Sequence, residues 1–232
     1  MKISIIIPTF NERDNIVKLI SEICKLNIEN LNVLVVDDNS PDGTADEVLR
    51  LKGQYPVELI KREKRLGIGS AYLNGFKYAL EQGADLIFEM DADLSHQSQA
   101  IPQFLKAAEN ADVVIGSRKI PGGQIIGWGL WRQFCSAGAM WFSRLILGLK
   151  TRDVTSGFRC YKREALNSFD LSKIKSNGYA FQEELIWLCE KNNCKIKEIP
   201  ITFIDRQSGK SKLTGRDVAE FFSSMVRLKL DK

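Results

Sequence analysis

The sequence has a single histidine, scattered cysteines and no long apolar run, and each of these features excludes a class of protein. His96 is the one histidine among 232 residues, which excludes a histidine-rich metal site and leaves one residue for a Ser-His-Asp triad. The five cysteines form no C-x-x-C pair. We therefore expect reduced thiols rather than a disulfide framework or a zinc site.

No segment approaches the roughly 18 consecutive apolar residues of a membrane-spanning helix, and the N-terminal run "MKISIIIPTF" is too short for a signal peptide. The net charge of +4 is too small to indicate a nucleic-acid partner, although it is compatible with an anionic ligand or a membrane surface. The content of 44% hydrophobic and 27% charged residues is typical of a folded domain. We expect a soluble or peripheral protein.

Short apolar segments alternate with amphipathic ones through the first half of the chain. We expect strands at 3–7, 32–36, 57–60, 85–90 and 112–116, and helices that begin near Asn11, Asp42, Gly67 and Ser98. Because these strands are apolar without alternation, they indicate a mostly parallel sheet covered by helices on both faces. The pattern predicts an α/β fold that binds ligands beyond the carboxyl ends of its strands.

The second half has a different pattern. Residues 120–129 are glycine-rich and predict a loop, and a helix is expected at 130–149, followed by a strand that runs into a helix at 154–166, a helix at 179–192 and a strand at 195–204. A loop at 205–215 precedes a last amphipathic helix that ends near Leu230.

The segment "MDADLSH" at 90–96 follows one of the predicted strands. Asp91 and Asp93 lie so close in sequence that their charges repel, so the pair needs a cation, a shared proton or a solvated loop. Mg²⁺ or Mn²⁺ bound between them could bridge to a diphosphate. The alternative is a solvated loop or a carboxylate that caps the next helix.

Two further polar turns follow predicted strands. In "VVDDNSPDGT", we expect one of Asp37 and Asp38 to accept hydrogen bonds from a nucleoside, while Ser40 to Gly43 form a tight turn. Glu12, in "PTFNE", is either a first-turn helix carboxylate or a ligand contact. The run "KREKRLGIGSAY" lacks a complete phosphate-loop motif, and we expect its four basic residues at 61–65 to be mostly solvated, with one facing a nucleotide.

Basic and aromatic residues are the further candidates for ligand contacts in the second half of the chain. An arginine fork suits a phosphate monoester, and Arg118, Arg132, Arg206 and Lys212 are candidates for that role, whereas we expect Lys210 to be solvated. One side of the helix at 130–149 carries Trp131, Phe134, Trp141, Leu145 and Leu149. This side either packs in the core or, with Trp128 and Arg132, lies at the headgroup level of a membrane.

Seven motifs together resemble the dolichol-phosphate mannose synthases, a group of family 2 glycosyltransferases with a GT-A fold. They are "IPTFNERDNI", "VVDDNSPDGT", "REKRLGIGSAY", "MDADLSH", "GSRK", "TSGFRCYKREAL" and "DRQSGKSKL", in this order and over nearly the whole chain. The resemblance implies a metal-dependent, inverting transfer of mannose from GDP-mannose to a polyprenyl phosphate such as dolichyl phosphate. It also implies a peripheral position on the cytoplasmic face of a membrane and allows for a membrane-embedded partner subunit.

The resemblance also implies roles for individual positions. The catalytic residues would be Asp91, Asp93 and Arg118, and the divalent metal, Mg²⁺ or Mn²⁺, would be held by Asp91, Asp93 and Ser95. The donor would contact Pro8, Phe10, Glu12, Val36, Asp38, Asp91, Ala92, Asp93, Arg118, Arg206 and Lys212. The acceptor phosphate would contact Arg118, Arg132 and Ser136. Residues 1–215 would form the catalytic domain, with an acceptor- or membrane-facing loop and helix at 120–150, followed by an amphipathic helix at 216–232.

The chain departs from this pattern at several positions. Some relatives have Gln where this chain has Ser95, a shorter ligand that can act through water, and many have Tyr in place of Phe10. Some relatives continue into C-terminal transmembrane helices, whereas this chain ends at Lys232, so it is either truncated or of a short peripheral type.

Three alternatives remain at this point. A UDP-glucose donor would keep the same chemistry. A soluble acceptor would need a carboxylate base, which Glu183 or Glu184 could supply. A sugar-nucleotide-binding regulator would bind donor and metal but would tolerate the loss of Arg118, Arg132 and Arg206.

Overall fold

The computed structural model describes residues 1–178, 180–205 and 215–230. In the last helix, side chains are described only from residue 220 onward. The centre of the fold is a seven-stranded sheet in the order β3-β2-β1-β4-β7-β5-β8. The strands span Val57–Lys61, Leu31–Asp37, Ile3–Thr9, Leu86–Glu89, Arg159–Lys162, Val113–Ser117 and Ile196–Pro200 in that order. Within the described residues, β7 is antiparallel to both neighbours and the other pairings are parallel.

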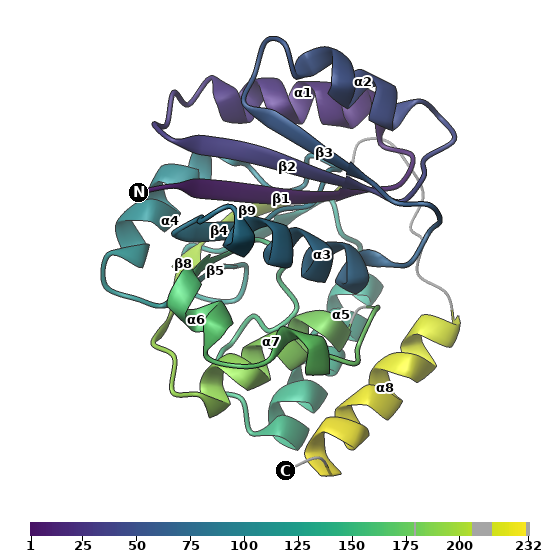
Figure 1. Ribbon diagram of the computed structural model, residues 1–232. Coiled ribbons are helices and arrows are strands. Elements are labelled where there is room, and N and C mark those ends of the chain that lie inside the picture. The colour runs from purple at the N-terminus through teal and green to yellow at the C-terminus, as the bar shows by residue number, and fades with distance from the viewer. Residues whose placement is uncertain (179, 206–214, 231–232) are drawn as a thin grey trace.

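Helices cover both faces of this sheet (Figure 1). One face carries α1 (Arg13–Cys24), α2 (Thr44–Leu51) and α4 (Ile101–Ala108), which follows a 3-10 turn at Ser98–Ala100. The other carries α3 (Ile68–Glu81), α5 (Leu130–Leu147), α6 (Arg163–Asn167), α7 (Ala180–Lys191) and α8 (Gly215–Leu230), with a 3-10 turn at Leu171–Lys173. In β1, Ile6 packs into one hydrophobic cluster and Ile5 and Ile7 into the other, because successive side chains point to opposite faces. The predicted helix-covered, mostly parallel sheet is confirmed.

The segment at 120–129, which its glycines predict to be a loop, is a loop only in part. Gln124–Ile126 forms β6, which pairs in parallel with β9 (Thr202–Ile204) in a second, two-stranded sheet. The strand predicted at 195–204 accordingly divides into β8 and β9, which belong to different sheets. A three-residue strand between glycines carries too few residues for a periodic signal, and its partner lies far away in the sequence.

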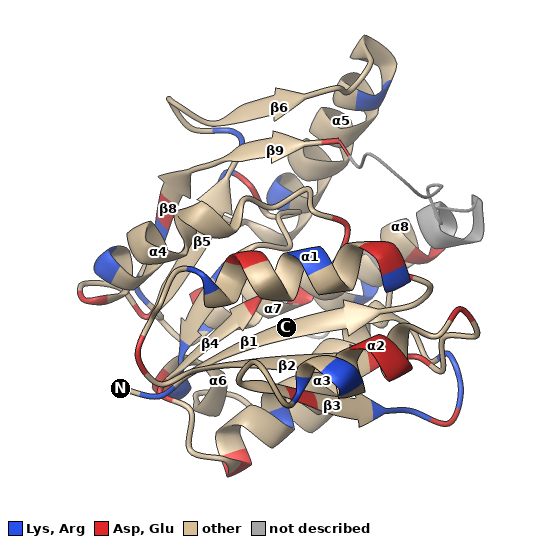
Figure 2. Ribbon diagram, turned by 90° about the horizontal axis from the view of Figure 1, so that it is seen from above, with Lys and Arg blue, Asp and Glu red and all other residues tan. Residues whose placement is uncertain are grey.

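Helix α5 exposes most of its aromatic side, and its ribbon carries basic but no acidic positions (Figure 2). Trp131, Phe134, Trp141 and Leu145 are 77%, 71%, 66% and 61% exposed, whereas Leu149, just beyond the helix, is buried. The core alternative for this side is therefore wrong for the four exposed residues. The buried side of α5 carries instead Met140, Ser143 and Leu147.

Helix α8 packs against α5 and α7 and completes the same hydrophobic cluster. Phe221, Met225 and Leu228 are buried there, and the ring of Phe222 meets that of Phe142 at 4.9 Å. Among the described helices, none is long and apolar enough to cross a membrane.

Candidate functional site

The polar turns predicted from the sequence converge at one edge of the sheet. Strand β1 lies between β2 and β4. The chain therefore adds β2 and β3 on one side of β1 and then crosses to add β4 on the other side. Such a reversal of strand order opens a crevice beyond the carboxyl ends of the strands. The turns after β1 and β2 are joined directly, because the Asp38 N–H donates to the Thr9 carbonyl at 3.0 Å. Asp91 and Asp93 follow β4 at the same edge.

Asp91 and Asp93 lie in a loop, since β4 ends at Glu89. The Asp91 N–H donates to His96 Nδ1 at 3.2 Å, and the Tyr72 hydroxyl donates to Asp91 Oδ1 at 3.3 Å. The Ser95 N–H donates to Asp93 Oδ1 at 3.1 Å, which closes a tight turn. The Asp91 side chain is 33% exposed. The carboxylate is therefore held from the protein side while part of it faces solvent.

The environment of this loop fixes the ionisation of its neighbours. Burial lowers the pKa of His96 to about 4, so the imidazole is neutral near pH 7. Because His96 Nδ1 accepts a hydrogen bond, the proton of the neutral ring is on Nε2. Burial, together with the charges of Asp91 and Glu89, raises the pKa of Tyr72 well above its ordinary value, so its hydroxyl remains a donor.

The loop suits a divalent cation only as an open site. No group of three or more His, Cys, Asp and Glu side chains within the described ranges could hold a metal ion. Mg²⁺ and Mn²⁺ fit the two carboxylates if phosphate oxygens and water supply the other ligands, which is how Mg²⁺ usually binds beside nucleotides. Ser95 is buried, and its Oγ has no hydrogen-bond partner among the described residues. Of the three predicted ligands it is the least accessible.

The two aspartates after β2 have different environments. Asp37 is fully buried and accepts hydrogen bonds from the Thr9 hydroxyl at 2.8 Å and from the Ser40 N–H at 2.9 Å. It therefore shapes the turn. Asp38 Oδ2 accepts from the N–H groups of Leu66 and Gly67 at 3.2 and 3.1 Å, which ties the start of α3 to this edge.

Three of the four basic residues at 61–65 are exposed, as predicted, and Arg62 is the exception. Its guanidinium is buried and forms an ion pair with Asp38, and it donates to Ser70 Oγ at 2.6 Å. The exposed Arg65 lies 4.5 Å from the centre of the Phe10 ring. Arg62 is thus part of the framework, and Arg65 with Phe10 is the basic and aromatic pair left at the edge.

The other predicted donor contacts differ in accessibility. Pro8, Phe10 and Glu12 are half-buried at the end of β1, where Glu12 Oε2 accepts a hydrogen bond from Asn15 Nδ2 at 2.8 Å. Val36 and Ala92 are buried, and the Val36 side chain belongs to the hydrophobic core. Val36 therefore offers no exposed side-chain surface to a donor.

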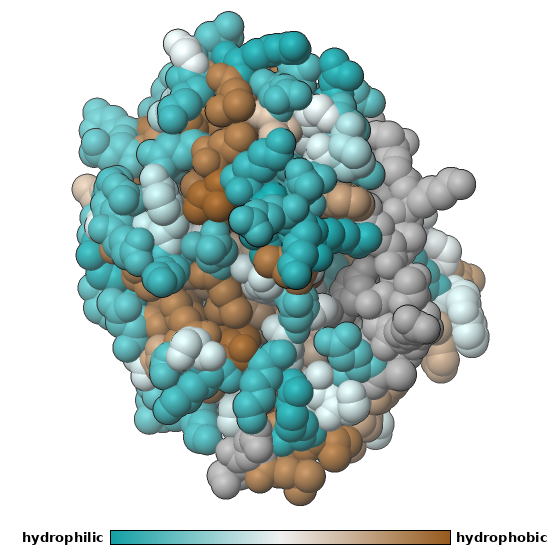
Figure 3. Space-filling view, turned by 45° about the vertical axis from the view of Figure 1, so that its right-hand side comes forward, coloured by the Kyte–Doolittle hydropathy of each residue, from teal (hydrophilic) through white to brown (hydrophobic). Residues whose placement is uncertain are grey.

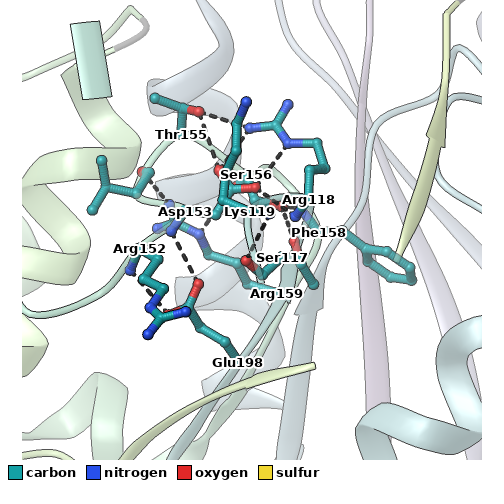
Figure 4. A network of polar contacts seen from close by, with 12 residues as sticks. Ser117, Arg118, Lys119, Arg152, Asp153, Thr155, Ser156, Phe158, Arg159 and Glu198 are labelled. Carbon is teal, nitrogen blue, oxygen red and sulfur yellow. Dashed lines mark hydrogen bonds and ion pairs between the residues drawn. The ribbon is translucent and has the colours of Figure 1, made fainter. Parts of the chain in front are cut away.

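Arg118 is held by a carboxylate that the sequence analysis did not identify (Figure 4). Its Nε and Nη2 donate to the two oxygens of Asp153 at 2.8 and 2.7 Å, and Nη2 also donates to Thr155 Oγ1 at 2.7 Å. Although burial raises the pKa of Asp153, the hydrogen bonds and charge of Arg118 outweigh it and hold that pKa below its usual value. Glu198 supports the loop by accepting from the Asp153 N–H at 3.0 Å.

A second buried arginine lies behind this pair. Arg159, on β7, donates to the carbonyl oxygens of Val154, Ser156 and Gln182 at 2.7, 2.7 and 2.8 Å. These three bonds connect the loop that carries Asp153 to the start of α7. Burial raises the pKa of Glu89 to about 7 and that of Glu183 to about 8 in the same region.

The predicted acceptor residues lie at the start of α5. Arg132 Nη1 donates to both carboxylate oxygens of Asp205 at 2.9 Å, and its guanidinium lies 4.1 Å from the centre of the Trp128 ring. Ser136 is one turn further along the helix and half-buried. The predicted residues Arg206, Lys210 and Lys212 lie outside the described residues.

The family model described as glycosyl transferase family 2 matches residues 4–169. The chain belongs to glycosyltransferase family 2. It is 39% identical over 228 residues to an undecaprenyl-phosphate mannosyltransferase of Micrococcus luteus, covering 98% of this chain and 93% of that protein. It is 41% identical over 220 residues to a polyprenol monophosphomannose synthase of Mycolicibacterium smegmatis, covering 93% and 82%. The family predicted from the seven motifs is confirmed.

The fold of this family 2 glycosyltransferase also matches a solved structure. The glucosyl-3-phosphoglycerate synthase of Mycobacterium tuberculosis, in complex with Mn²⁺, UDP-glucose and phosphoglyceric acid, superposes with a TM-score of 0.72 at 17% identity. The alignment covers 98% of this chain and 79% of that one. At this identity the likeness concerns the fold alone, and the predicted GT-A fold is confirmed.

The sequence alone did not indicate the residues that hold this candidate site in place. Asp153 is 35 residues from its partner Arg118, and Tyr72 is 19 residues from Asp91. Neither pair lies in a regular pattern. Both partners do lie within or near motifs that carried the family resemblance, namely "GIGSAY" and "TSGFRCYKREAL".

Proposed function

We propose that this glycosyltransferase transfers mannose from GDP-mannose to a polyprenyl phosphate at a membrane surface. The observation that carries the proposal is a continuous series of contacts from the D-x-D loop to α5. His96, which contacts Asp91, lies 5.7 Å from the Phe203 ring, and Phe203 lies 5.5 Å from the Trp128 ring beneath Arg132. The loop suited to a nucleotide diphosphate is therefore adjacent to the start of the helix that exposes its aromatic side.

On the donor side, Asp91 and Asp93 would hold a divalent ion against the diphosphate. The ion, when bound, would neutralise charge that develops on the leaving nucleotide. Phe10 and Arg65 lie at the same edge of the sheet, where they can contact the nucleoside. Asp38 would act largely by holding the backbone of Leu66 and Gly67 near the donor.

On the acceptor side, the nucleophile would be a phosphate oxygen that is already anionic near neutral pH. Catalysis would then rest on holding this oxygen in line with the anomeric carbon, with inversion at that carbon. Arg118 and Arg132 are the described candidates for holding the phosphate. Each is paired with a carboxylate, so an incoming phosphate would share the guanidinium with Asp153 or Asp205.

The burial of Glu183 and Glu184 favours this acceptor over a neutral hydroxyl. Glu183 is buried, and Glu184 accepts hydrogen bonds from the N–H groups of Lys175 and Ser176 at 3.2 and 2.8 Å. Neither carboxylate is placed to take a proton from a soluble acceptor. A phosphate nucleophile removes the need for such a base.

The exposed side of α5 supports a lipid surface as the partner. The charge of α5 is positive only, because its charged residues are Arg132 and Arg144 and the helix has no acidic residue. Apolar surface also reaches the lower end of the molecule, where α8 ends with the exposed Val226 and Leu230 (Figure 3). Large exposed apolar patches mark interaction sites, and tryptophan with arginine suits the headgroup region of a membrane.

The identity of the sugar is supported by the relatives. Both proteins described above, at 39% and 41% identity, are named for mannose transfer to a polyprenyl phosphate or for its product. The guanine base of the donor follows from the family resemblance. UDP-glucose remains the second candidate donor because the chemistry at the D-x-D loop would be the same.

The experiment is transfer of labelled sugar to a short-chain polyprenyl phosphate, with GDP-mannose and UDP-glucose compared in Mn²⁺, in Mg²⁺ and in EDTA. We expect metal-dependent product from GDP-mannose. Product from UDP-glucose alone would correct the donor. Binding of GDP-mannose without transfer to any acceptor would instead support a sugar-nucleotide-binding regulator.

A further inference from the structure

The carboxylate of Asp91 is enclosed on several sides by side chains that do not themselves reach the site surface. Tyr72 donates to Oδ1 at 3.3 Å, and His96 Nε2 lies 3.8 Å from Oδ2, beyond hydrogen-bond range. A methyl group placed on Gly157 would lie 3.2 Å from Oδ2. The position of this carboxylate is thus limited by α3, by the loop after β4 and by the segment before β7.

The Tyr72 hydroxyl has little freedom to point elsewhere. The residue is fully buried, and its ring stacks on Phe181 at 6.0 Å with an interplanar angle of 4° and on Phe76 at 6.2 Å with an angle of 25°. A buried hydroxyl needs an acceptor, and the one that Tyr72 reaches is Asp91. The packing of α3 against α7 therefore fixes the Tyr72 ring, and the Tyr72 hydroxyl in turn holds one carboxylate oxygen of Asp91.

His96 is fixed in a similar way on the opposite side. Its ring stacks on Phe158 at 5.1 Å with an angle of 17° and meets the edge of Phe203 at 5.7 Å. Its Nδ1 accepts the Asp91 N–H, so the same imidazole holds the Asp91 backbone and faces its side chain. Gly157 leaves space for the Asp91 carboxylate, and a larger residue at position 157 would fill that space.

We propose that Tyr72 is a positioning residue, whose hydroxyl holds the Asp91 carboxylate in the orientation that receives the divalent ion and the donor diphosphate. This inference rests on the proposed function, in which Asp91 contacts that ion. Hydrogen bonds from residues behind a metal ligand commonly change metal affinity 10- to 100-fold. Because Tyr72 is fully buried, it would not reach the donor, and its contribution would pass through Asp91.

The chain contains a matched control on the same helix. Tyr78, also in α3, donates its hydroxyl to a carboxylate oxygen of Glu58 at 2.6 Å, away from the D-x-D loop. Tyr72→Phe and Tyr78→Phe each remove one hydroxyl that donates to a carboxylate. The substitutions differ in which carboxylate loses its donor.

The test is the dissociation constant of Mn²⁺ in the presence of GDP, measured from the electron paramagnetic resonance signal of free Mn²⁺. We expect Tyr72→Phe to weaken Mn²⁺ binding about 10-fold, with unchanged GDP affinity in EDTA, and Tyr78→Phe to leave both unchanged. Equal Mn²⁺ affinity in Tyr72→Phe and the parent would overturn the inference, and so would equal losses in both variants.

A double substitution separates this inference from the function on which it rests. If Tyr72 acts through Asp91, then Tyr72→Phe should add nothing to the loss of Mn²⁺ affinity in Asp91→Ala. An additive loss would contradict the positioning role while leaving the metal site intact. Unchanged Mn²⁺ affinity in Asp91→Ala alone would instead refute the metal assignment in the proposed function.

Discussion

The region around the strand ends and the exposed side of α5 use their side chains in opposite ways. At the strand ends, charged groups such as Asp38, Arg118 and Arg159 are buried and held by several partners. Along α5, apolar groups such as Trp131 and Phe134 are left in solvent. The first region is organised by the protein itself, which suits a polar ligand in fixed geometry. We propose that the second is covered by an apolar partner.

The same contrast appears in two arginine–aspartate pairs. The Arg118 and Asp153 side chains are 7% and 0% exposed, whereas those of Arg132 and Asp205 are 42% and 28% exposed. The first pair is part of the framework. The second can exchange its partner for a ligand at lower cost, because water already reaches both side chains.

Removing one partner from each pair should give the largest difference between the two regions. Asp153→Ala leaves a buried guanidinium without its carboxylate, and we expect it to lower the free energy of unfolding by about 3–5 kcal/mol. Asp205→Ala should lower it by less than about 1 kcal/mol. Chemical denaturation of both variants and the parent measures the difference. Equal losses would contradict the division into a fixed and an open region.

The two sides of α5 offer a second comparison. Leu147→Ala, on the buried side, should cost about 2–5 kcal/mol of unfolding free energy. Trp131→Ser should change stability by less than about 0.5 kcal/mol, since its side chain is mostly in solvent. The same Trp131 variant should weaken binding to phosphatidylglycerol vesicles about 10-fold or more, because it removes one large apolar side chain from the interface.

Sedimentation with vesicles and chemical denaturation provide the two readings for these variants. If Trp131→Ser destabilised the fold as much as Leu147→Ala does, the exposed side would be part of the core. If it left vesicle binding unchanged, a lipid surface would not be what covers α5.

Glu183 should have a smaller effect on the free energy of unfolding, and this effect depends on pH. Burial raises its pKa from 4.5 to about 8, so between these values the folded chain binds more protons at this carboxyl than the unfolded chain does. Its contribution to the free energy of unfolding is therefore present below pH 4.5 and declines as pH rises toward 8, by about 1 kcal/mol per pH unit.

Glu183→Gln should make the decline between pH 6.5 and 7.5 shallower and leave the part that is due to Glu89, whose pKa burial raises to about 7. This window lies above the pH range in which His96, with its pKa lowered to about 4 from 6.5, acts in the opposite direction. Denaturation at both pH values, in parent and variant, measures the slope. An identical slope in the two proteins would show that Glu183 does not titrate in this range.

The sequence predicted the parts of the fold that depend on local patterns. Apolar runs located the strands of the parallel sheet, and carboxylates after β4 and β2 located the edge at which its polar turns converge. The exposure of Trp131 was left open, because an apolar helix side looks the same whether it faces a core or a membrane.

The remaining features depend on contacts between distant residues. Strand β6 forms because Gln124 pairs with Thr202, and Arg118 is held because the loop of Asp153 folds against it. Arg62 stands in an otherwise exposed basic run, and its burial follows from its pairing with Asp38. None of these contacts has a periodic signal in the sequence.

The most direct test of the central claim compares two acceptors that differ by one phosphate. Labelled mannose transfer from GDP-mannose, with Mn²⁺, would be measured into vesicles that contain either a polyprenyl phosphate or the corresponding polyprenol. We expect transfer to the polyprenyl phosphate alone, because the nucleophile would be its anionic oxygen and neither Glu183 nor Glu184 is placed to activate a hydroxyl. Transfer to the polyprenol, or to neither lipid, would contradict that claim.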